Sequence, residues 1–131
     1  MKLLVIDIQK GIANDGLFNY NNFINDTNKV INAARENNIE VIYVQHDDGP
    51  KSNCSIGNEE FDIATQVAPK AGEKIYVKNI NSCFGNQDLT EYLSNSDEDT
   101  LMIVGLLTNF CIDASVKSAY ERGYQVIIPQ G

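Results

Sequence analysis

Three ionisable side chains follow apolar stretches of the chain, at positions where folding can bring them together. Asp7 follows LLVI, Lys78 follows KIYV, and Cys111 follows TLMIVGLLTNF. A charged group at the end of a buried strand must either reach water or find a partner. We therefore expect the three side chains to converge at one edge of a sheet, where a carboxylate, an ammonium and a thiol together suit acyl transfer.

The three groups would divide the chemistry between them. The thiolate is the nucleophilic form of cysteine, and a helix start and the Lys78 ammonium would both stabilise it, so we expect Cys111 to ionise at a lower pH than a free thiol. Asp7 can accept the thiol proton and pass it to a leaving amine. The candidate oxyanion donors are the backbone N–H groups of Leu107 and Cys111 in the turn LLTNFC.

Each residue also has an ordinary structural explanation. A cysteine after a strand commonly packs in the core, a lysine at a strand end can be solvated, and an aspartate can cap a turn. Two rival thiols, Cys54 and Cys83, do not begin a convincing helix after a buried strand, so we interpret them as structural. The combination of Asp7, Lys78 and Cys111 is what favours a site.

The spacing of apolar residues indicates the elements that must position these groups. Short runs rich in Val and Ile predict strands, buried on both faces, at residues 3–8, 40–46, 74–79, 100–106 and 124–129. An apolar series from Tyr20 to Ala34 at i, i+3, i+4, i+7 spacing predicts a helix, and a shorter one is expected at residues 88–93. A third helix should follow Cys111 and end near Gly123. Its apolar face is predicted to consist of Ile112, Val116, Ala119 and Tyr120.

Alternation of strand and helix predicts a doubly wound α/β sheet of parallel strands with helices on both faces. The 131 residues, 43% of them hydrophobic, suffice for one domain and are too few for two, so residues 1–131 are expected to form a single domain. One connection, residues 47–73, is too long and polar for simple alternation. We expect it to be a substrate lid or a subunit contact.

Charge and cysteine usage narrow the class of protein. A net charge of -8 with ten scattered basic residues argues against a nucleic-acid partner. The first apolar run is too short to span a membrane and is followed by no signal-peptide cleavage site. Three irregularly spaced cysteines fit free thiols in a reducing compartment. We therefore expect a cytoplasmic protein that acts on a small molecule.

The chain resembles the isochorismatase-like cysteine hydrolases, which include nicotinamidases and N-carbamoylsarcosine amidases. The pieces that carry the resemblance are LLVIDIQ, VIYVQHDDGP, VKNINSCF and GLLTNFCIDASVKSAYERGYQVII. The resemblance implies that Asp7, Lys78 and Cys111 are the family triad and that Cys111 forms a thioester-type intermediate that water hydrolyses. It also implies a cis peptide bond between Leu106 and Leu107, which helps to aim N–H groups at the oxyanion.

Departures from the family pattern concern metal and substrate. Nicotinamidases bind a divalent ion with Asp-x-His and a second histidine, whereas this chain has a single histidine, His46, so neither a metal site nor a cofactor is expected. His46, Phe84 and Phe110 match pocket positions of the family, although the histidine can equally be a hydrogen-bonded strand end and each phenylalanine can be core. Retention of Cys111 favours hydrolysis of a C–N bond in a small amide, ureide or carbamoyl compound over cleavage of a vinyl ether.

The length of the chain is a further departure, because family members usually continue beyond YQVIIPQG with a helix and often a strand. We expect a shortened domain or a fragment, and a homo-oligomer that covers the open sheet edge. Two alternatives stay open. One is a catalytically idle member that serves as an interaction subunit. The other is a receiver-like domain, which would normally need more carboxylates beside Asp7 to bind Mg²⁺.

Overall fold

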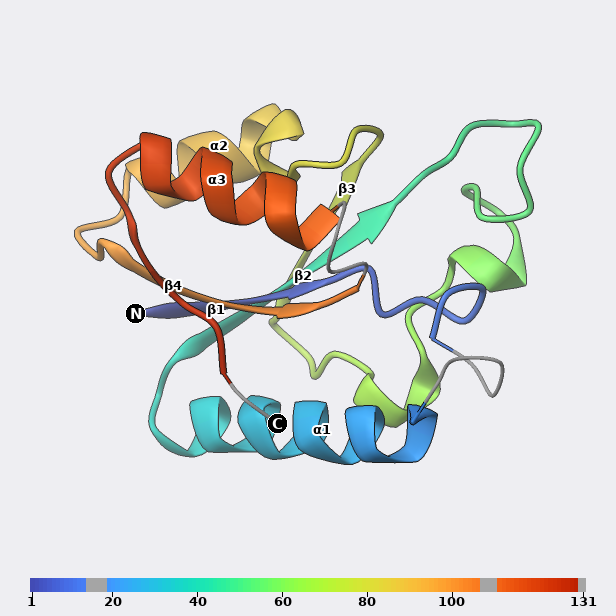
Figure 1. The fold of residues 1–131 in the computed structure, drawn as a ribbon, viewed down its shortest axis with the longest axis horizontal. Coiled ribbons are helices and arrows are strands. Elements are labelled where there is room, and N and C mark those ends of the chain that lie inside the picture. Colours follow the sequence, from blue (N-terminus) through green and yellow to red (C-terminus); the bar gives the residue numbers. More distant parts are fainter. Residues whose placement is uncertain (14–18, 107–110, 130–131) are drawn as a thin grey trace.

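Five parallel strands form a single sheet in the computed structural model, which describes residues 1–13, 19–106 and 111–129 (Figure 1). The strands are β1 (Lys2–Ile6), β2 (Glu40–His46), β3 (Lys74–Lys78), β4 (Thr100–Gly105) and β5 (Gln125–Ile127). Their order across the sheet is β3-β2-β1-β4-β5. The chain thus starts in the centre, builds outward to one edge, and then crosses to the other side of β1. The five strands predicted from the apolar runs are confirmed, with ends that differ by at most two residues.

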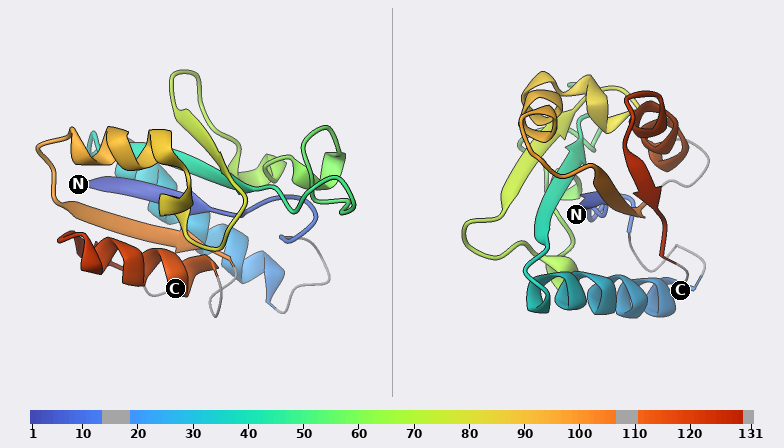
Figure 2. Two further views of the ribbon diagram at one scale, coloured as in Figure 1. Left: turned by 90° about the horizontal axis from the view of Figure 1, so that it is seen from above. Right: turned by 90° about the vertical axis from the view of Figure 1, so that its left-hand side faces the viewer.

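The three α-helices of the described residues lie on the two faces of the sheet. Helix α1 (Tyr20–Glu36) covers one face, and α2 (Gln87–Ser94) and α3 (Asp113–Glu121) cover the other, as the right view of Figure 2 shows. Short 3₁₀ turns, η1 (Glu59–Phe61), η2 (Thr65–Val67) and η3 (Cys83–Gly85), occur in the connections around β3. This arrangement confirms the predicted doubly wound α/β class.

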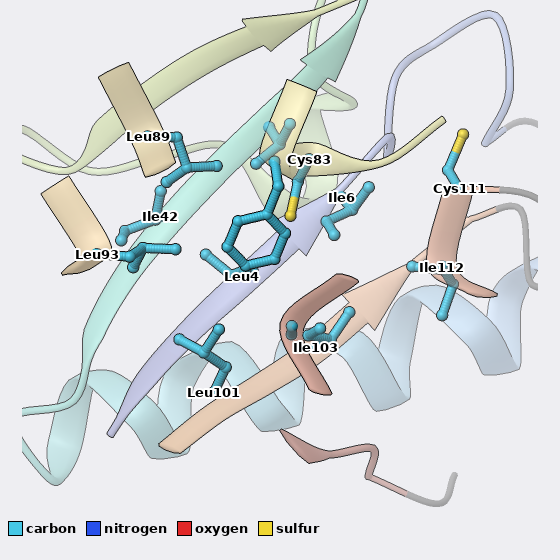
Figure 3. Packing of buried hydrophobic residues seen from close by; sticks show 13 residues of the cluster. Leu4, Ile6, Ile42, Cys83, Leu89, Leu93, Leu101, Ile103, Cys111 and Ile112 are labelled. Carbon is cyan, nitrogen blue, oxygen red and sulfur yellow. The ribbon is translucent and has the colours of Figure 1, made fainter. Parts of the chain in front are cut away.

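Strand β1 has both faces buried because it lies between the two hydrophobic clusters of the core. Leu3 and Val5 belong to the cluster under α1. Leu4 and Ile6 belong to the cluster under α2 and α3, part of which is drawn in Figure 3. Successive side chains of a strand point to opposite faces, so a continuous apolar run is what a central strand needs.

Two details of the predicted packing are wrong. The prediction that all strands are buried on both faces fails at the sheet edges, where Ile75 of β3 is 47% exposed and Ile127 of β5 is 40% exposed. Tyr120 was expected on the packed face of its helix but is 76% exposed. Helix α3 buries Ala119, as predicted, together with Ser115. Tyr120 follows Ala119 by one residue and so lies about 100° further around the helix.

The long connection after β2 is attached to the segment that follows β1. The backbone N–H of Lys10 donates to Asp62 O at 2.8 Å, and that of Ala64 donates to Ile8 O at 2.9 Å. Gln9 pairs with Ile63 in an antiparallel bridge between these contacts. The second half of residues 47–73 is therefore fixed beside the carboxyl end of β1. A lid or subunit contact in this segment stays a prediction.

No helix in the described ranges has both the length and the apolar character required to cross a membrane.

Candidate active site

The three predicted catalytic side chains meet at the carboxyl edge of the sheet. Lys78, the last residue of β3, places its Nζ 3.1 Å from Asp7 Oδ2 and 3.4 Å from Cys111 Sγ. The side chains of Lys78 and Asp7 are 0% and 1% exposed. Asp7 directly follows β1, and Cys111 precedes α3 by two residues. The structure therefore brings together, out of contact with bulk water, residues that lie far apart in the sequence.

The backbone at the ends of β1 and β4 has the unusual conformations that this convergence requires. Asp7 adopts a φ of 59°, and its N–H donates to Val44 O at 2.9 Å. Gly105 has a φ of +140°, and a Cβ added there would overlap Ile6 O. A side chain at this position is incompatible with the close approach of the two strands. Glycine at the end of β4 thus lets this strand end lie close against Ile6, the residue before Asp7.

The Cys111 thiol faces away from the hydrophobic core. Figure 3 shows its sulfur directed out of the cluster, whereas the sulfur of Cys83 points among the core side chains. Burial raises the pKa of Cys83 to about 11, which fits the structural role expected for it. Cys111 Sγ also lies 3.8 Å from Asn81 Oδ1. Sequence reasoning missed Asn81, although the polar turn NINS directly after Lys78 was a signal for it.

His46 contacts the triad directly. Its Nδ1 lies 3.0 Å from Lys78 Nζ, and its Nε2 lies 2.8 Å from Asp48 Oδ1. We expected a pocket residue or a hydrogen-bonded strand end, and the structure shows the second arrangement with Lys78 as a partner. The register of the sheet explains the contact, because His46 and Lys78 are paired at the ends of neighbouring β2 and β3.

Gln9 holds the backbone of His46 in place and was missed by sequence reasoning. Its amide Oε1 accepts from His46 N at 2.8 Å, and its Nε2 donates to His46 O at 3.1 Å and to Phe61 O at 2.8 Å. The side chain is fully buried. A buried polar side chain is stable only when its groups are paired, as they are here. The signal in the sequence was an amide two residues after Asp7 in an otherwise apolar stretch.

The remaining predicted site residues have other positions. Phe84 lies in the core, 7% exposed, and its ring stacks on Tyr124 with centroids 6.0 Å apart. The guanidinium of Arg122 lies 4.9 Å from the ring centroid of Phe84. Of the two alternatives for Phe84, the structure shows core packing. Leu107, Phe110 and the bond between Leu106 and Leu107 involve residues outside the described ranges.

Burial raises the pKa of both acids in the site. The pKa of Asp7 lies above its ordinary value because burial disfavours the carboxylate, and the charge of Lys78 only partly opposes this effect. The pKa of Cys111 is also raised, first by burial and then by the proximity and negative charge of Asp7. The expectation that Cys111 ionises more readily than a free thiol is therefore wrong. One ammonium balances one anion, and Asp7 already supplies that anion.

A single negative charge is thus shared between Asp7 and Cys111. Transfer of the thiol proton to Asp7 creates the thiolate without changing the net charge of the buried group, whereas loss of that proton to water would leave two anions beside one ammonium. The other carboxylate oxygen, Asp7 Oδ1, is buried and has no hydrogen-bond donor among the described residues. It is available to accept that proton.

The donors around Lys78 form a cation-binding shell. Asp7, His46 and Cys111 offer a carboxylate oxygen, an imidazole nitrogen and a sulfur that lie within 4.8 Å of one another. Such a set resembles a zinc site. The Lys78 ammonium lies 3.0–3.4 Å from each of them, so the cation at the centre of this shell belongs to the protein itself.

A polar cleft of about 310 Å³ borders Lys78 at the end of β3. Its other lining residues are Asp47, Val77, Asn79, Gly85, Asn86, Gln87 and Asp88. A separate cleft of about 270 Å³ lies between α1 and β4, and its lining includes none of the triad residues. Of the triad residues, the polar cleft includes only Lys78 in its lining.

Comparison with known proteins assigns the family. The family model described as "Isochorismatase domain" matches residues 2–130. This chain belongs to the isochorismatase family. The match also sets aside the receiver-like alternative.

Relatives of the isochorismatase-family chain include hydrolases of C–N bonds. The uncharacterized isochorismatase family protein YrdC of Bacillus subtilis is 31% identical over 129 residues, which are 96% of this chain and 69% of that protein. N-carbamoylsarcosine amidase of an Arthrobacter species is 32% identical over 68 residues, 52% of this chain and 26% of that enzyme.

Solved structures share the fold of this isochorismatase-family chain. The crystal structure of N-carbamoylsarcosine amidase from Thermoplasma acidophilum superposes with a TM-score of 0.83 at 23% sequence identity. The match covers 98% of this chain and 81% of that one.

Proposed function

We propose that this chain is a metal-independent cysteine amidohydrolase that cleaves a C–N bond of a small amide, ureide or carbamoyl compound. The observation that carries the proposal is the mutual contact of one buried carboxylate, one buried ammonium and one thiol. These groups supply a base, a fixed positive charge and a nucleophile, which are the parts that covalent acyl transfer requires. The amidases among the relatives support the choice of bond.

In the first half of the reaction, the Cys111 thiol becomes acylated. Asp7 accepts the thiol proton as Sγ attacks the carbonyl carbon of the substrate, and the carbonyl oxygen becomes an oxyanion. The oxyanion then collapses, the C–N bond breaks, and the leaving nitrogen takes the proton from Asp7. Lys78 keeps its proton throughout and balances whichever of Asp7 and Cys111 is anionic. Backbone N–H groups of Leu107 and Cys111 remain our candidate oxyanion donors.

In the second half, water releases the acyl group. Asp7, again a carboxylate, removes a proton from water as its oxygen attacks the thioester carbon. Collapse of the new tetrahedral intermediate expels the Cys111 thiolate, which takes the proton back from Asp7. The products are the free amine and an acid, and the site returns to its starting state.

Independence from metal is proposed on the basis of the donor set. A single histidine leaves too few imidazoles for the ligand set of the nicotinamidases. Among the described residues, the shell with ligand character encloses Lys78, which already carries the positive charge needed there.

A nucleophile substitution tests the proposal. Wild-type protein is screened for release of ammonia or amine from a library of small amides, ureides and carbamoyl compounds. Cys111→Ala should abolish release, while Cys54→Ala, which alters a half-buried thiol, should retain it. Acid quenching during turnover should leave an acyl adduct on the peptide that contains Cys111, detected by mass spectrometry. Equal turnover by wild type and Cys111→Ala would refute the assignment, and no turnover on any compound would favour the idle family member.

A further inference from the structure

The Lys78 ammonium is surrounded by more acceptors than it has protons. Its Nζ lies 3.1 Å from Asp7 Oδ2, 3.0 Å from His46 Nδ1, 3.1 Å from Ile80 O and 3.4 Å from Cys111 Sγ. A lysine ammonium offers three N–H donors. The oxygen and nitrogen acceptors therefore compete with the thiol for these protons, and they help to decide where the ammonium lies relative to the thiol.

The two ring contacts of His46 determine its tautomer. Nδ1 faces an ammonium, which can only donate, so Nδ1 must be the unprotonated acceptor. The ring proton of neutral His46 then belongs to Nε2, which donates to Asp48 Oδ1 at 2.8 Å. Asp48 and Lys78 therefore favour the same tautomer, one from each side of the ring. With the opposite tautomer, an N–H of the ring would point at the N–H groups of Lys78.

We propose that His46 and Asp48 are a positioning pair that holds the Lys78 ammonium between Asp7 and Cys111. The inference rests on the proposed function of that site and adds two residues to it. Gln9 fixes the backbone of His46 through two hydrogen bonds, so only the ring orientation remains to be set. Asp48 contacts the ring from the solvent side, where the Asp48 side chain is 54% exposed, and Lys78 contacts the ring from the buried side.

Positioning matters here because the ammonium has to serve two anions in turn. When the proton moves from Cys111 to Asp7, the charge that Lys78 balances moves from oxygen to sulfur. An acceptor that stays neutral holds the ammonium midway between the two, whereas without it the ammonium would shift toward the carboxylate and away from the thiolate. His46 supplies such an acceptor, 3.0 Å from Nζ.

Two amide substitutions separate this role from a structural one. The amide of His46→Asn can place its oxygen near the position of Nδ1 and keep an acceptor for Lys78, but it does not reach Asp48. The longer His46→Gln places its amide near the position of Nε2 and loses the acceptor for Lys78. We expect His46→Gln to have a kcat at least about tenfold below that of His46→Asn. The reverse order, or equal losses, would overturn the proposal.

A measurement that needs no substrate tests the pair even if the proposed function fails. The rate of Cys111 alkylation by iodoacetamide reports the thiolate, which Lys78 favours. His46→Gln and Asp48→Ala should slow alkylation toward the rate of Lys78→Met, whereas His46→Asn and Asp48→Asn should slow it less. Unchanged alkylation in Asp48→Ala and His46→Gln would overturn the pair. Failure of the amide screen alone would count against the proposed function only.

The tautomer itself can be observed, because the chain has one histidine. In ¹⁵N-histidine-labelled protein, the NMR shift of Nδ1 should be that of an unprotonated acceptor and the shift of Nε2 that of a protonated nitrogen. Asp48→Ala should move both shifts toward a mixture of tautomers, and Asp48→Asn, which keeps an oxygen acceptor, should move them less. A protonated Nδ1 in the wild-type protein would contradict the proposal.

Discussion

Replacing Asp7 by Asn should make Cys111 more reactive toward alkylation while abolishing hydrolysis. The two effects have opposite signs because Asp7 disfavours the thiolate electrostatically yet is the base that the proposed reaction needs. In the variant, Lys78 has no carboxylate beside it, and its charge is free to stabilise the thiolate. The resting site would then hold a thiolate and an ammonium, without a group that can carry the proton to the leaving amine.

The distance between the two acids sets the size of the effect. Their ligand atoms lie within 4.8 Å. One unit charge at that separation, with an effective dielectric constant of about 20, disfavours the thiolate by about 3 kcal/mol. This energy corresponds to a thiolate population, and hence an alkylation rate, on the order of a hundredfold higher in Asp7→Asn at a pH below the thiol pKa.

The assay is the rate of iodoacetamide labelling between pH 5 and 9, with the label located by peptide mass spectrometry. Asp97→Asn, which removes an exposed carboxylate from a distant loop, is the matched control and should behave as wild type. Cys83, which is 0% exposed, should stay unlabelled in both variants and shows that they are folded. Labelling of Cys111 in Asp7→Asn at the wild-type rate or below, with Cys83 still protected, would refute the shared-charge reasoning.

Two further predictions follow from the geometry of the site. Gly105→Ala should lower the free energy of unfolding, measured by urea denaturation, by more than about 3 kcal/mol, because the new Cβ overlaps Ile6 O. Gly72→Ala is the control: Gly72 also has a positive φ but no neighbour within 4 Å, so this variant should lose only about 1–2 kcal/mol. Similar losses of stability in both variants would show that the contact between Gly105 and Ile6 does not require a glycine. Lys78→Ala should bind Co²⁺ in the emptied shell and show a thiolate-to-cobalt absorption band. The wild-type protein and the double variant Lys78→Ala, Cys111→Ala should both lack the band. A band in either protein would show that cobalt binds at another site.

The sequence was sufficient to predict the sheet but not its edges. Runs such as LLVI and LMIV are apolar at every position, which indicates burial between two layers of helix. The run IYV has the same character, yet β3 lies at an edge and exposes Ile75. The pattern of apolar residues predicts that a segment is a strand. The position of that strand in the sheet depends on the order in which the strands pair. That order is a property of the whole chain.

The candidate site was predictable in its members but not in its electrostatics. Asp7, Lys78 and Cys111 could be found because each follows an apolar run that ends at the same sheet edge. The contact between His46 and Lys78 joins residues 32 positions apart and depends on strand register, which the sequence does not display. The direction of the Cys111 pKa shift was predicted wrongly because the shift depends on burial and on which anion already pairs with the Lys78 ammonium.

The long separations within the triad link the chemistry of this chain to its folding. Lys78 lies 71 residues from Asp7 and 33 from Cys111 along the sequence. Contacts of such separation form only when non-local strand pairing is complete. A partly folded chain therefore has a cysteine with neither base nor counter-ion, and its thiol cannot carry out the proposed hydrolysis. Hydrolysis at Cys111 thus requires the completed sheet, and loss of activity and loss of cooperative structure should coincide along a denaturation curve.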